Sequence, residues 1–304
     1  MPNRNASNGG HQGEMQRAVA GRQLSAATRV VGVIGHPVEH SMSPLLHNTA
    51  FHELGLDWVS VGFPVAPGHA AVALAGARAL GVRGLSVTMP HKEEAAAAAD
   101  DVAADAARLG AVNCIVAVDG GWRGENTDGA GFIAALARGD RFTPSGTRCL
   151  VVGAGGAARA VIAALGEAGA AEVVVVNRTA ERARTAAVLA GAVGRVGEAG
   201  EATGCDLVVN ATPIGMGDVA DRPAGWPVDP GLFRSGQVVV DLVYHPPVTM
   251  WLAAAAEQGA ITLNGLGMLV HQAALQIGHW TGQVAPVDAM WHAVAGPEHD
   301  DAAH

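Results

Sequence analysis

The fold of this chain is decided by the stretch Arg148-Cys149-Leu150-Val151-Val152-Gly153-Ala154-Gly155-Gly156-Ala157-Ala158. Its first five residues form an apolar run typical of a buried strand, and the pattern predicts a helix over 156–168 beside the glycines. In the motif G-x-G-x-x-A, Gly153 permits a tight turn, Gly155 lets the backbone approach a pyrophosphate, and Ala158 lets helix and strand pack closely. Free N–H groups at the helix start attract the anion. The residues expected to hold a dinucleotide here are Gly153, Ala154, Gly155, Gly156 and Ala157.

The residues after the next predicted strand, 173–176, indicate which dinucleotide is bound. An enzyme that uses NAD normally has Asp or Glu there, to bind the ribose 2′-hydroxyl. This chain has Asn177-Arg178-Thr179, with Arg182 one helical turn further on. A guanidinium can hold a 2′-phosphate by two hydrogen bonds, so the pattern predicts NADP(H). The alternative is that both arginines are solvated helix charges.

Strand and helix signals alternate on both sides of the glycine loop. Before it, strands are predicted at 30–34, 58–65, 85–88 and 112–118, and helices at 43–55, 68–80 and 90–100, with Ser43 as the first N-cap. After it, strands are predicted at 173–176, 207–209, 238–240 and 261–263, and helices at 179–190, 247–258, 265–281 and 286–294. This order predicts two α/β layers of parallel strands with helices on their faces.

The domain organisation follows from the last two predicted helices, which come after the second series of strands is complete. We expect them to return to the first domain. The predicted fold is therefore α/β with two domains separated by a cleft: a substrate-binding domain with a mainly parallel sheet, and an NADP-binding Rossmann domain. The expected boundaries are a disordered leader at 1–27, a substrate-binding catalytic domain at 28–131 plus 264–296, the NADP-binding domain at 132–263, and a flexible tail at 297–304.

Composition and charge exclude several classes of function. A net charge of −9 argues against nucleic acid as a partner, because such binding needs clustered Lys and Arg. No apolar run reaches the roughly 20 residues of a membrane span. The cysteines, Cys114, Cys149 and Cys205, lie in or beside predicted strands without metal-ligand spacing, so we expect buried free thiols, no metal, and a cytoplasmic location.

Two segments of the first domain carry polar side chains at helix starts. Ser41 and Ser43 flank the start of a predicted helix, where hydroxyls and free N–H groups can bind a carboxylate; taken alone, Ser43 would be only an N-cap. Thr88 and Lys92 follow a predicted strand, at the edge where open α/β sheets bind ligands. Taken alone, Lys92 would be a surface lysine.

Together these segments make the chain resemble the shikimate dehydrogenase family. The matching motifs occur in family order from about residue 30 to 282. They are His40-Ser41-Met42-Ser43-Pro44-Leu45-Leu46-His47-Asn48, Val87-Thr88-Met89-Pro90-His91-Lys92, Gly110-Ala111-Val112-Asn113, Glu125-Asn126-Thr127-Asp128-Gly129, the glycine loop, Asn177-Arg178-Thr179, Asn210-Ala211-Thr212-Pro213-Ile214-Gly215-Met216, Val243-Tyr244-His245-Pro246-Pro247-Val248-Thr249 and Met268-Leu269-Val270-His271-Gln272-Ala273-Ala274.

The resemblance implies reversible reduction of 3-dehydroshikimate to shikimate by NADPH, a step of chorismate and aromatic amino-acid biosynthesis. It implies a catalytic pair, Lys92 and Asp128. The residues it assigns to the substrate are Ser41, Ser43, Ser86, Thr88, Asn113, Asp128, Tyr244 and Gln272, with Ser41 and Ser43 on the carboxylate. Beside the cofactor it places Thr212, Met216 and Gly265.

The chemistry of ketone reduction agrees with this pair. Hydride addition builds negative charge on the carbonyl oxygen, which a proton or a cation must meet at once. Lys92 can donate that proton, while Asp128 orients the ammonium group and binds a hydroxyl; no metal is required.

One departure and two alternatives accompany the resemblance. Most members of the family carry Asn at the position of Ser86, which leaves open a paralogue that acts on quinate or an amino-substituted shikimate. Asn177-Arg178 counts against the quinate enzymes that use NAD. A non-catalytic relative that binds the metabolite and regulates a partner is the other alternative, and the presence of Lys92 and Asp128 argues against it. The sequence leaves a monomer or a homodimer open.

Overall fold

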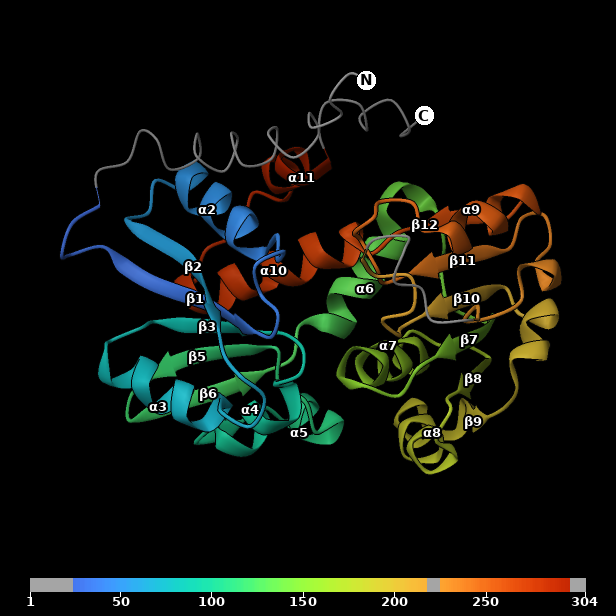
Figure 1. Ribbon diagram of the computed structural model, residues 1–304, viewed down its shortest axis with the longest axis horizontal. Helices are drawn as coiled ribbons and strands as arrows, with labels where there is room; N and C mark the ends of the chain where they lie inside the picture. Colours follow the sequence, from blue (N-terminus) through green and yellow to red (C-terminus); the bar gives the residue numbers. More distant parts are fainter. Residues whose placement is uncertain (1–23, 218–224, 296–304) are drawn as a thin grey trace, which may run out of the picture.

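In the computed structural model, which describes residues 24–217 and 225–295, the chain forms two six-stranded sheets (Figure 1). The first has the strand order β2-β1-β3-β5-β6-β4 and the second has the order β12-β11-β10-β7-β8-β9. The first comprises β1 (Arg29–Gly35), β2 (Trp58–Pro64), β3 (Gly84–Val87), β4 (Asp101–Val102), β5 (Cys114–Val118) and β6 (Gly121–Glu125). The second comprises β7 (Arg148–Val152), β8 (Glu172–Val176), β9 (Gly194–Val196), β10 (Leu207–Asn210), β11 (Val238–Asp241) and β12 (Ile261–Leu263).

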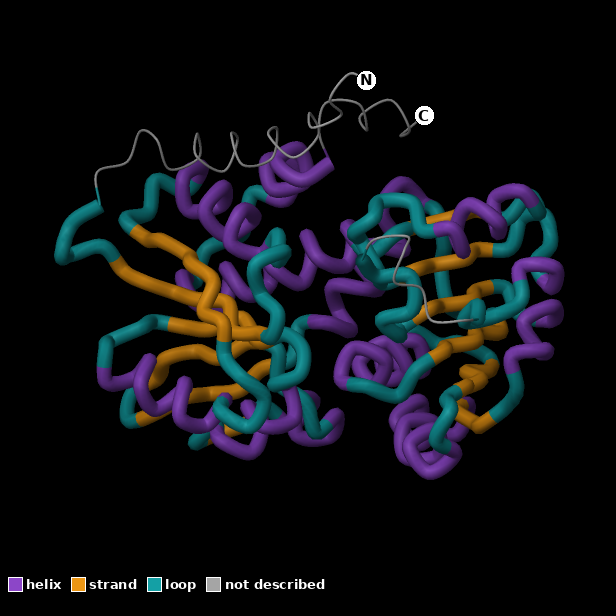
Figure 2. The backbone as a smooth tube through the Cα atoms, in the orientation of Figure 1, coloured by secondary structure: helices purple, strands orange, loops and turns teal. Residues whose placement is uncertain are grey.

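Helices cover both faces of each sheet, so the chain has the predicted α/β fold with two domains. Near the first sheet lie α2 (Ser43–Glu53), α3 (Ala70–Ala79), α4 (Lys92–Ala98), α5 (Ala104–Leu109) and α11 (Val287–Ala295). The second sheet is flanked by α7 (Gly156–Glu167), α8 (Ala180–Ala187) and α9 (Met250–Glu257). Between the two groups of strands in Figure 2 run α6 (Asp128–Ala137) and α10 (Leu266–Thr281).

The second sheet is fully parallel, and its central strands β7, β8, β10 and β11 are buried on both faces. In β7, Cys149 and Val151 join the core under α7, whereas Leu150 and Val152 join the core under α9. The same alternation runs through β8 and β10, because successive side chains of a strand point to opposite faces. A strand buried on both faces reads as a continuous apolar run, which is the signal that predicted these strands.

The first sheet is parallel only in part, and here one expectation was wrong. We expected the strand at 112–118 to run parallel to the others, but β5 is antiparallel to both β3 and β6. Val118 pairs with Gly121, so Asp119-Gly120 forms a two-residue hairpin turn. Asp-Gly between two short strands is a common hairpin signal, and it reverses the chain without a crossover helix.

The helix α6 was not anticipated, because its first turns contain Gly129 and Gly131. The structure shows why small residues stand there. A Cβ atom on Gly129 would lie 2.9 Å from the backbone oxygen of Ala160, and one on Gly131 would lie 2.7 Å from the backbone nitrogen of Gln272. Close packing against α7 and α10 therefore outweighs the low helix propensity of glycine.

Helix α10 joins the two halves of the molecule. Met268, in its first turn, belongs to the core of the second sheet, whereas Val270 and Ile277 pack with Val31 and Phe51 in the core of the first. Of the predicted leader and tail, residues 1–23 and 297–304 lie outside the described residues, and residues 25–28 form a turn before β1. Among the helices that the structure describes, none is both long and apolar enough to cross a bilayer.

The core of the first sheet encloses a histidine. His47 on α2 is fully buried, its Nδ1 lies 3.0 Å from Ser60 Oγ, and its ring meets the Trp280 ring edge-on at 4.9 Å. Burial lowers the pKa of His47 to about 3, an effect that the neighbouring Gln276 side chain partly offsets. His47 is therefore neutral in the folded protein at neutral pH.

The buried imidazole predicts a pH-dependent stability. In the unfolded chain a histidine titrates near pKa ~6.5, so between that pH and about pH 3 only the unfolded state binds the proton. The stability contributed by neutral His47 is complete above the unfolded pKa and is lost as the pH falls, by about 2 kcal/mol at pH ~5. The free energy of unfolding, measured in urea above the unfolded-state pKa and again at pH ~5, should show this loss in the wild type but not in His47→Gln. His52→Gln, exposed on the same helix, is the control; equal pH dependence in all three proteins would contradict the prediction.

Candidate active site

A cavity of about 280 Å³ lies where the carboxyl ends of β1 and β3 face the second sheet. It collects both residues of the predicted catalytic pair and all of the predicted substrate residues, which are Ser41, Ser43, Ser86, Thr88, Lys92, Asn113, Asp128, Tyr244 and Gln272. Its other wall includes Ala157, Met216 and Gly265, three of the residues predicted to lie beside the cofactor. The cavity thus joins the two predicted sites.

The centre of the cavity is an ion pair. Lys92 is the first residue of α4 and Asp128 the first of α6, and Lys92 Nζ donates to Asp128 Oδ2. The Lys92 side chain is 16% exposed and that of Asp128 is 4% exposed, so the ammonium group reaches the cavity while the carboxylate lies beneath it. The backbone N–H of Asp128 donates to Asn126 Oδ1 at 3.0 Å, which fixes the start of α6.

Asn113 holds the carboxylate from the other side. Its Oδ1 accepts the backbone N–H of Thr127 at 2.8 Å, so the amide orientation is fixed by a group that can only donate. Its Nδ2 then donates to Asp128 Oδ1 at 2.7 Å. Because each carboxylate oxygen has its own donor, Asp128 is held as a charged acceptor next to the lysine.

The serines at the start of α2 lie at one end of the cavity. Ser43 N–H donates to Ser41 Oγ at 3.3 Å. Ser43 was expected to be the N-cap, but the structure makes Met42 the capping residue and Ser43 the first residue of the helix, with no side-chain cap. The Ser43 hydroxyl is therefore not used as a cap and lines the cavity. Burial raises the pKa of Tyr244, which lies nearby.

The glycine loop has the shape that a pyrophosphate needs. Gly153 has φ +122°, and a Cβ there would lie 2.8 Å from the Ala211 backbone oxygen, so only glycine fits. At Gly155 a Cβ would meet nothing within 4 Å, which leaves an open approach to the backbone. Helix α7 starts at Gly156 without a side-chain cap, so its first N–H groups are free for an anion. A Cβ on Gly156 would lie 3.1 Å from Lys92 Cδ, so the loop borders the predicted catalytic lysine.

The predicted phosphate clamp lies after β8, away from the cavity. Asn177 Nδ2 donates to the Thr179 backbone oxygen at 3.0 Å. Arg178 and Arg182 are exposed, and the described part of the chain gives neither of them an ion-pair partner. Arg184, on the same helix, is instead paired with Glu181.

The loop after β10 is held by a buried aspartate. Asn210 Nδ2 donates to Asp241 Oδ1 at 2.9 Å, and Asn210 Oδ1 accepts from Thr212 Oγ1 at 2.6 Å. Burial raises the pKa of Asp241 to about 6. These bonds direct the loop so that Met216 reaches the cavity wall. Thr212 does not line the cavity.

The sequence missed the residues that support the site. Thr127 and Asn126, which hold Asn113 and Asp128, belong to the matched motif at 125–129 but received no role. Leu242, Val243 and Met268 line the apolar wall, and no polar pattern marks them.

Lys92 is the only lysine in the sequence, where every other cationic side chain apart from histidine is an arginine.

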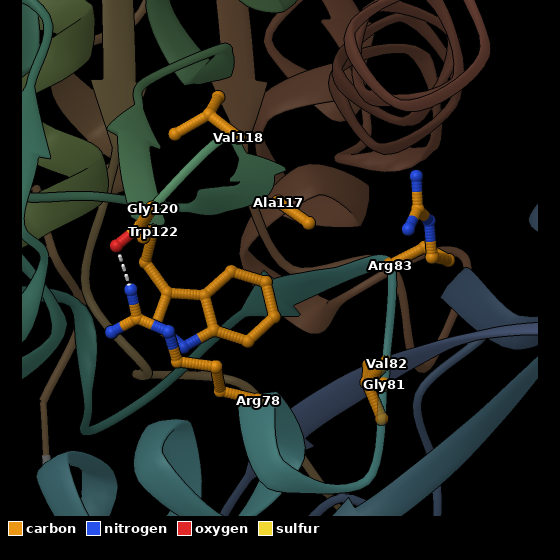
Figure 3. Close-up of a pocket in the computed structure, with 9 residues that line it drawn as sticks. Arg78, Gly81, Val82, Arg83, Ala117, Val118, Gly120 and Trp122 are labelled. Carbon is orange, nitrogen blue, oxygen red and sulfur yellow. Dashed lines mark hydrogen bonds between the residues drawn. The ribbon is translucent and has the colours of Figure 1, made fainter.

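A second hollow, of about 240 Å³, contains none of the predicted site residues (Figure 3). Within it Arg78 donates to the Gly120 backbone oxygen, the bond drawn in the figure, and pairs with Asp100 at 3.2 Å. Its guanidinium is therefore already occupied. Within the described residues, no group of three His, Cys, Asp or Glu side chains could hold a metal ion.

Comparison with known proteins shows which family has this arrangement of domains and site residues. Residues 33–115 match the shikimate dehydrogenase substrate-binding domain, residues 136–211 match the shikimate/quinate 5-dehydrogenase family, and residues 265–295 match the shikimate 5′-dehydrogenase C-terminal domain. An NADP(+)-dependent shikimate dehydrogenase of Methanopyrus kandleri is 45% identical over 281 residues, 89% of this chain and 96% of the relative. The chain belongs to the shikimate dehydrogenase family.

Other members of the shikimate dehydrogenase family extend the similarity. The NADP(+)-dependent enzyme of Moorella thermoacetica is 47% identical over 88% of this chain and 93% of its own length. The structure of the Thermus thermophilus enzyme in complex with NADP(H) and shikimate is similar with a TM-score of 0.80 and 39% identity, covering 87% of this chain and 98% of that one. The similarity covers nearly all of the described residues, so both sheets belong to the family fold.

Proposed function

We propose that this chain is an NADP-dependent oxidoreductase that reversibly reduces 3-dehydroshikimate to shikimate, in chorismate and aromatic amino-acid biosynthesis. The observation that carries the proposal is the single cavity in which Lys92, Asp128 and the polar residues around them face the glycine loop. The names of the curated relatives, which cover the chain nearly from end to end, support the same activity.

In this proposal different polar residues of the cavity bind different groups of the substrate. Ser41 and Ser43, at the start of α2, bind the carboxylate with their hydroxyls and the free N–H groups of that helix. Asn113, Asp128 and Gln272 bind ring hydroxyls from the opposite side. Thr88, Tyr244 and Ser86 line the remaining surface.

The dinucleotide is held by the second domain. Residues 153–157 would hold its pyrophosphate, Arg178 and Arg182 with Asn177 and Thr179 would hold its 2′-phosphate, and Thr212, Met216 and Gly265 would line its nicotinamide end. When bound, the cofactor supplies the hydride. Because Gly156 borders Lys92, the loop that would hold the cofactor adjoins the ion pair.

Lys92 is the proton donor and acceptor of the proposed reaction. During ketone reduction its Nζ donates a proton to the carbonyl oxygen as charge develops there, and in the reverse direction it takes that proton back. Asp128, fixed by Asn113, keeps the ammonium group aimed into the cavity and accepts from a substrate hydroxyl. A lysine suits this role better than an arginine, because an arginine does not give up its proton in proteins.

The remaining features of the proposal concern the whole molecule. We place the substrate-binding domain at residues 28–131 plus 264–296 and the NADP-binding domain at 132–263, with the cavity between them. We further propose that the enzyme acts in the cytoplasm as a monomer or homodimer. The three cysteines are buried and unpaired, as expected for a reducing compartment.

The substrate can be tested by comparing reactions. We expect NADP(+) reduction with shikimate to exceed that with quinate at least about tenfold in kcat/KM, since a site that does not pair an added hydroxyl discriminates against it. Each substrate is assayed with NADP(+) and with NAD(+). Equal or faster reaction with quinate or an amino-substituted shikimate would instead favour the paralogue that Ser86 leaves open. Binding of shikimate without turnover would favour the regulatory relative.

A further inference from the structure

Behind the cavity lies a second glutamine that does not line it. Gln276 stands one turn after Gln272 on α10 and is fully buried. Its Nε2 donates to the Asn113 backbone oxygen at 3.0 Å and to Gln272 Oε1 at 2.9 Å. Gln276 thus contacts two of the residues assigned to the substrate without touching the cavity itself.

These bonds determine which way the Gln272 amide faces. The Asn113 backbone oxygen can only accept, so the nitrogen of Gln276 must point to it, and this nitrogen then also faces Gln272 Oε1. Gln272 must therefore keep its oxygen on the inner side. Its Nε2 donates one hydrogen to the Leu269 backbone oxygen at 2.8 Å, which leaves the second hydrogen for the cavity.

Gln276 also relieves a competition at Asn113. Asn113 Nδ2 has two hydrogens but three acceptors within reach: Asp128 Oδ1 at 2.7 Å, Thr127 Oγ1 at 2.9 Å and Gln272 Oε1 at 3.3 Å. Because Gln272 Oε1 receives a shorter bond from Gln276, the Asn113 hydrogens remain available to Thr127 and to the catalytic carboxylate.

The far end of Gln276 meets the core of the first sheet. Among the described residues, Gln276 Oε1 and His47 Nε2 are both buried without a hydrogen-bond partner, although the Gln276 side chain lies close enough to counteract the lowering of the His47 pKa by burial. Ser60 Oγ, at 3.0 Å from Nδ1, fixes the other side of the His47 ring. The amide of Gln276 is thus fixed through its nitrogen, which donates to the Asn113 backbone oxygen and to Gln272 Oε1.

We propose that Gln276 is a positioning residue, which holds Gln272 so that its amide N–H points into the cavity as a donor to a ring hydroxyl of the substrate. The inference rests on the proposed function, because the hydroxyl belongs to shikimate. Gln276 touches neither substrate nor cofactor, so its effect passes through Gln272 and belongs to substrate binding rather than to cofactor binding.

Steady-state kinetics of Gln276→Leu test this role. We expect the KM for shikimate to rise about tenfold, as for the loss of one well-aimed hydrogen bond, while kcat falls less and the KM for NADP(+) stays within about twofold. Gln276→Met, of similar volume, gives the same comparison should the leucine variant not fold. Thr281→Val, which removes a hydroxyl bonded within the same helix, is the control and should leave both KM values unchanged.

A double variant separates positioning from a general loss of structure. If Gln276 acts through Gln272, the shikimate KM of Gln272→Ala/Gln276→Leu lies within about twofold of that of Gln272→Ala alone. The inference is overturned if the two fold-changes multiply, if the KM for NADP(+) rises equally, or if Gln276→Leu keeps the wild-type KM for shikimate. Failure of the proposed function looks different, because the wild type itself would then not turn over shikimate.

Discussion

Replacement of Lys92 by alanine is expected to lower kcat for shikimate oxidation about 1,000-fold, with the KM for NADP(+) within about threefold of the wild-type value. Lys92 is the only lysine of the chain, and its Nζ lies on Asp128 at the cavity wall. The substitution removes the proposed proton donor, whereas the glycine loop and the exposed arginines that are proposed to hold the cofactor are unchanged. Steady-state rates at saturating shikimate and varied NADP(+) concentration measure both quantities.

The variant Lys92→Arg distinguishes proton transfer from simple charge. It keeps a cation next to Asp128 but does not release a proton at ordinary pH. We expect it to be nearly as inactive as Lys92→Ala. If Lys92→Arg kept a tenth or more of wild-type kcat, the lysine would act only as a fixed positive charge. Wild-type turnover in Lys92→Ala would contradict the mechanism altogether.

The second sheet could be predicted nearly completely because its signals are local. The continuous apolar runs at 149–152, 173–176 and 238–240 each specify a strand buried on both faces, and the glycines between β7 and α7 specify the turn. Each predicted strand of this unit lies within a residue or two of the observed one. The short strand β9 was missed, because Gly194–Val196 is too brief to form a pattern.

The first sheet was harder to predict because its deciding contacts are distant in sequence. The direction of β5 depends on the Asp119-Gly120 hairpin, which a β-α-β reading passes over. The helix α6 begins Asp128-Gly-Ala-Gly, a poor helix sequence, and forms because α7 and α10 leave room only for glycine. Neither neighbour is visible from residues 128–131 alone.

The candidate site shows the same contrast between local sequence signals and contacts that are distant in sequence. Residue type and position after a strand singled out Lys92 and Thr88, but only the resemblance connected them with Asp128 and Gln272, far along the chain. The structure brings these side chains to one cavity. Gln276 could not be recognised at all, since a polar residue on a largely apolar helix gives no sign of which buried partner it meets.

The largest expected change in cofactor use comes from the double variant Arg178→Ala/Arg182→Ala. Both side chains are exposed after β8, and the described residues offer them no carboxylate. Hydrogen bonds to a charged group contribute about 1.5–3 kcal/mol each, so removal of both should lower the ratio of kcat/KM for NADP(+) to that for NAD(+) by at least about 100-fold. The change should come almost wholly from a higher KM for NADP(+), because NAD(+) has no 2′-phosphate to lose contact with.

The matched control lies on the same helix. Arg184→Ala removes an equally exposed guanidinium, but one that pairs with Glu181, so it should leave the cofactor ratio unchanged. If Arg184→Ala shifted the ratio as much as the double variant, the effect would be a general loss of positive charge rather than a clamp. If the double variant kept the wild-type ratio, the arginines would be solvated helix charges. The contrast tests directed hydrogen bonds, because a diffuse field would not distinguish arginines this close together.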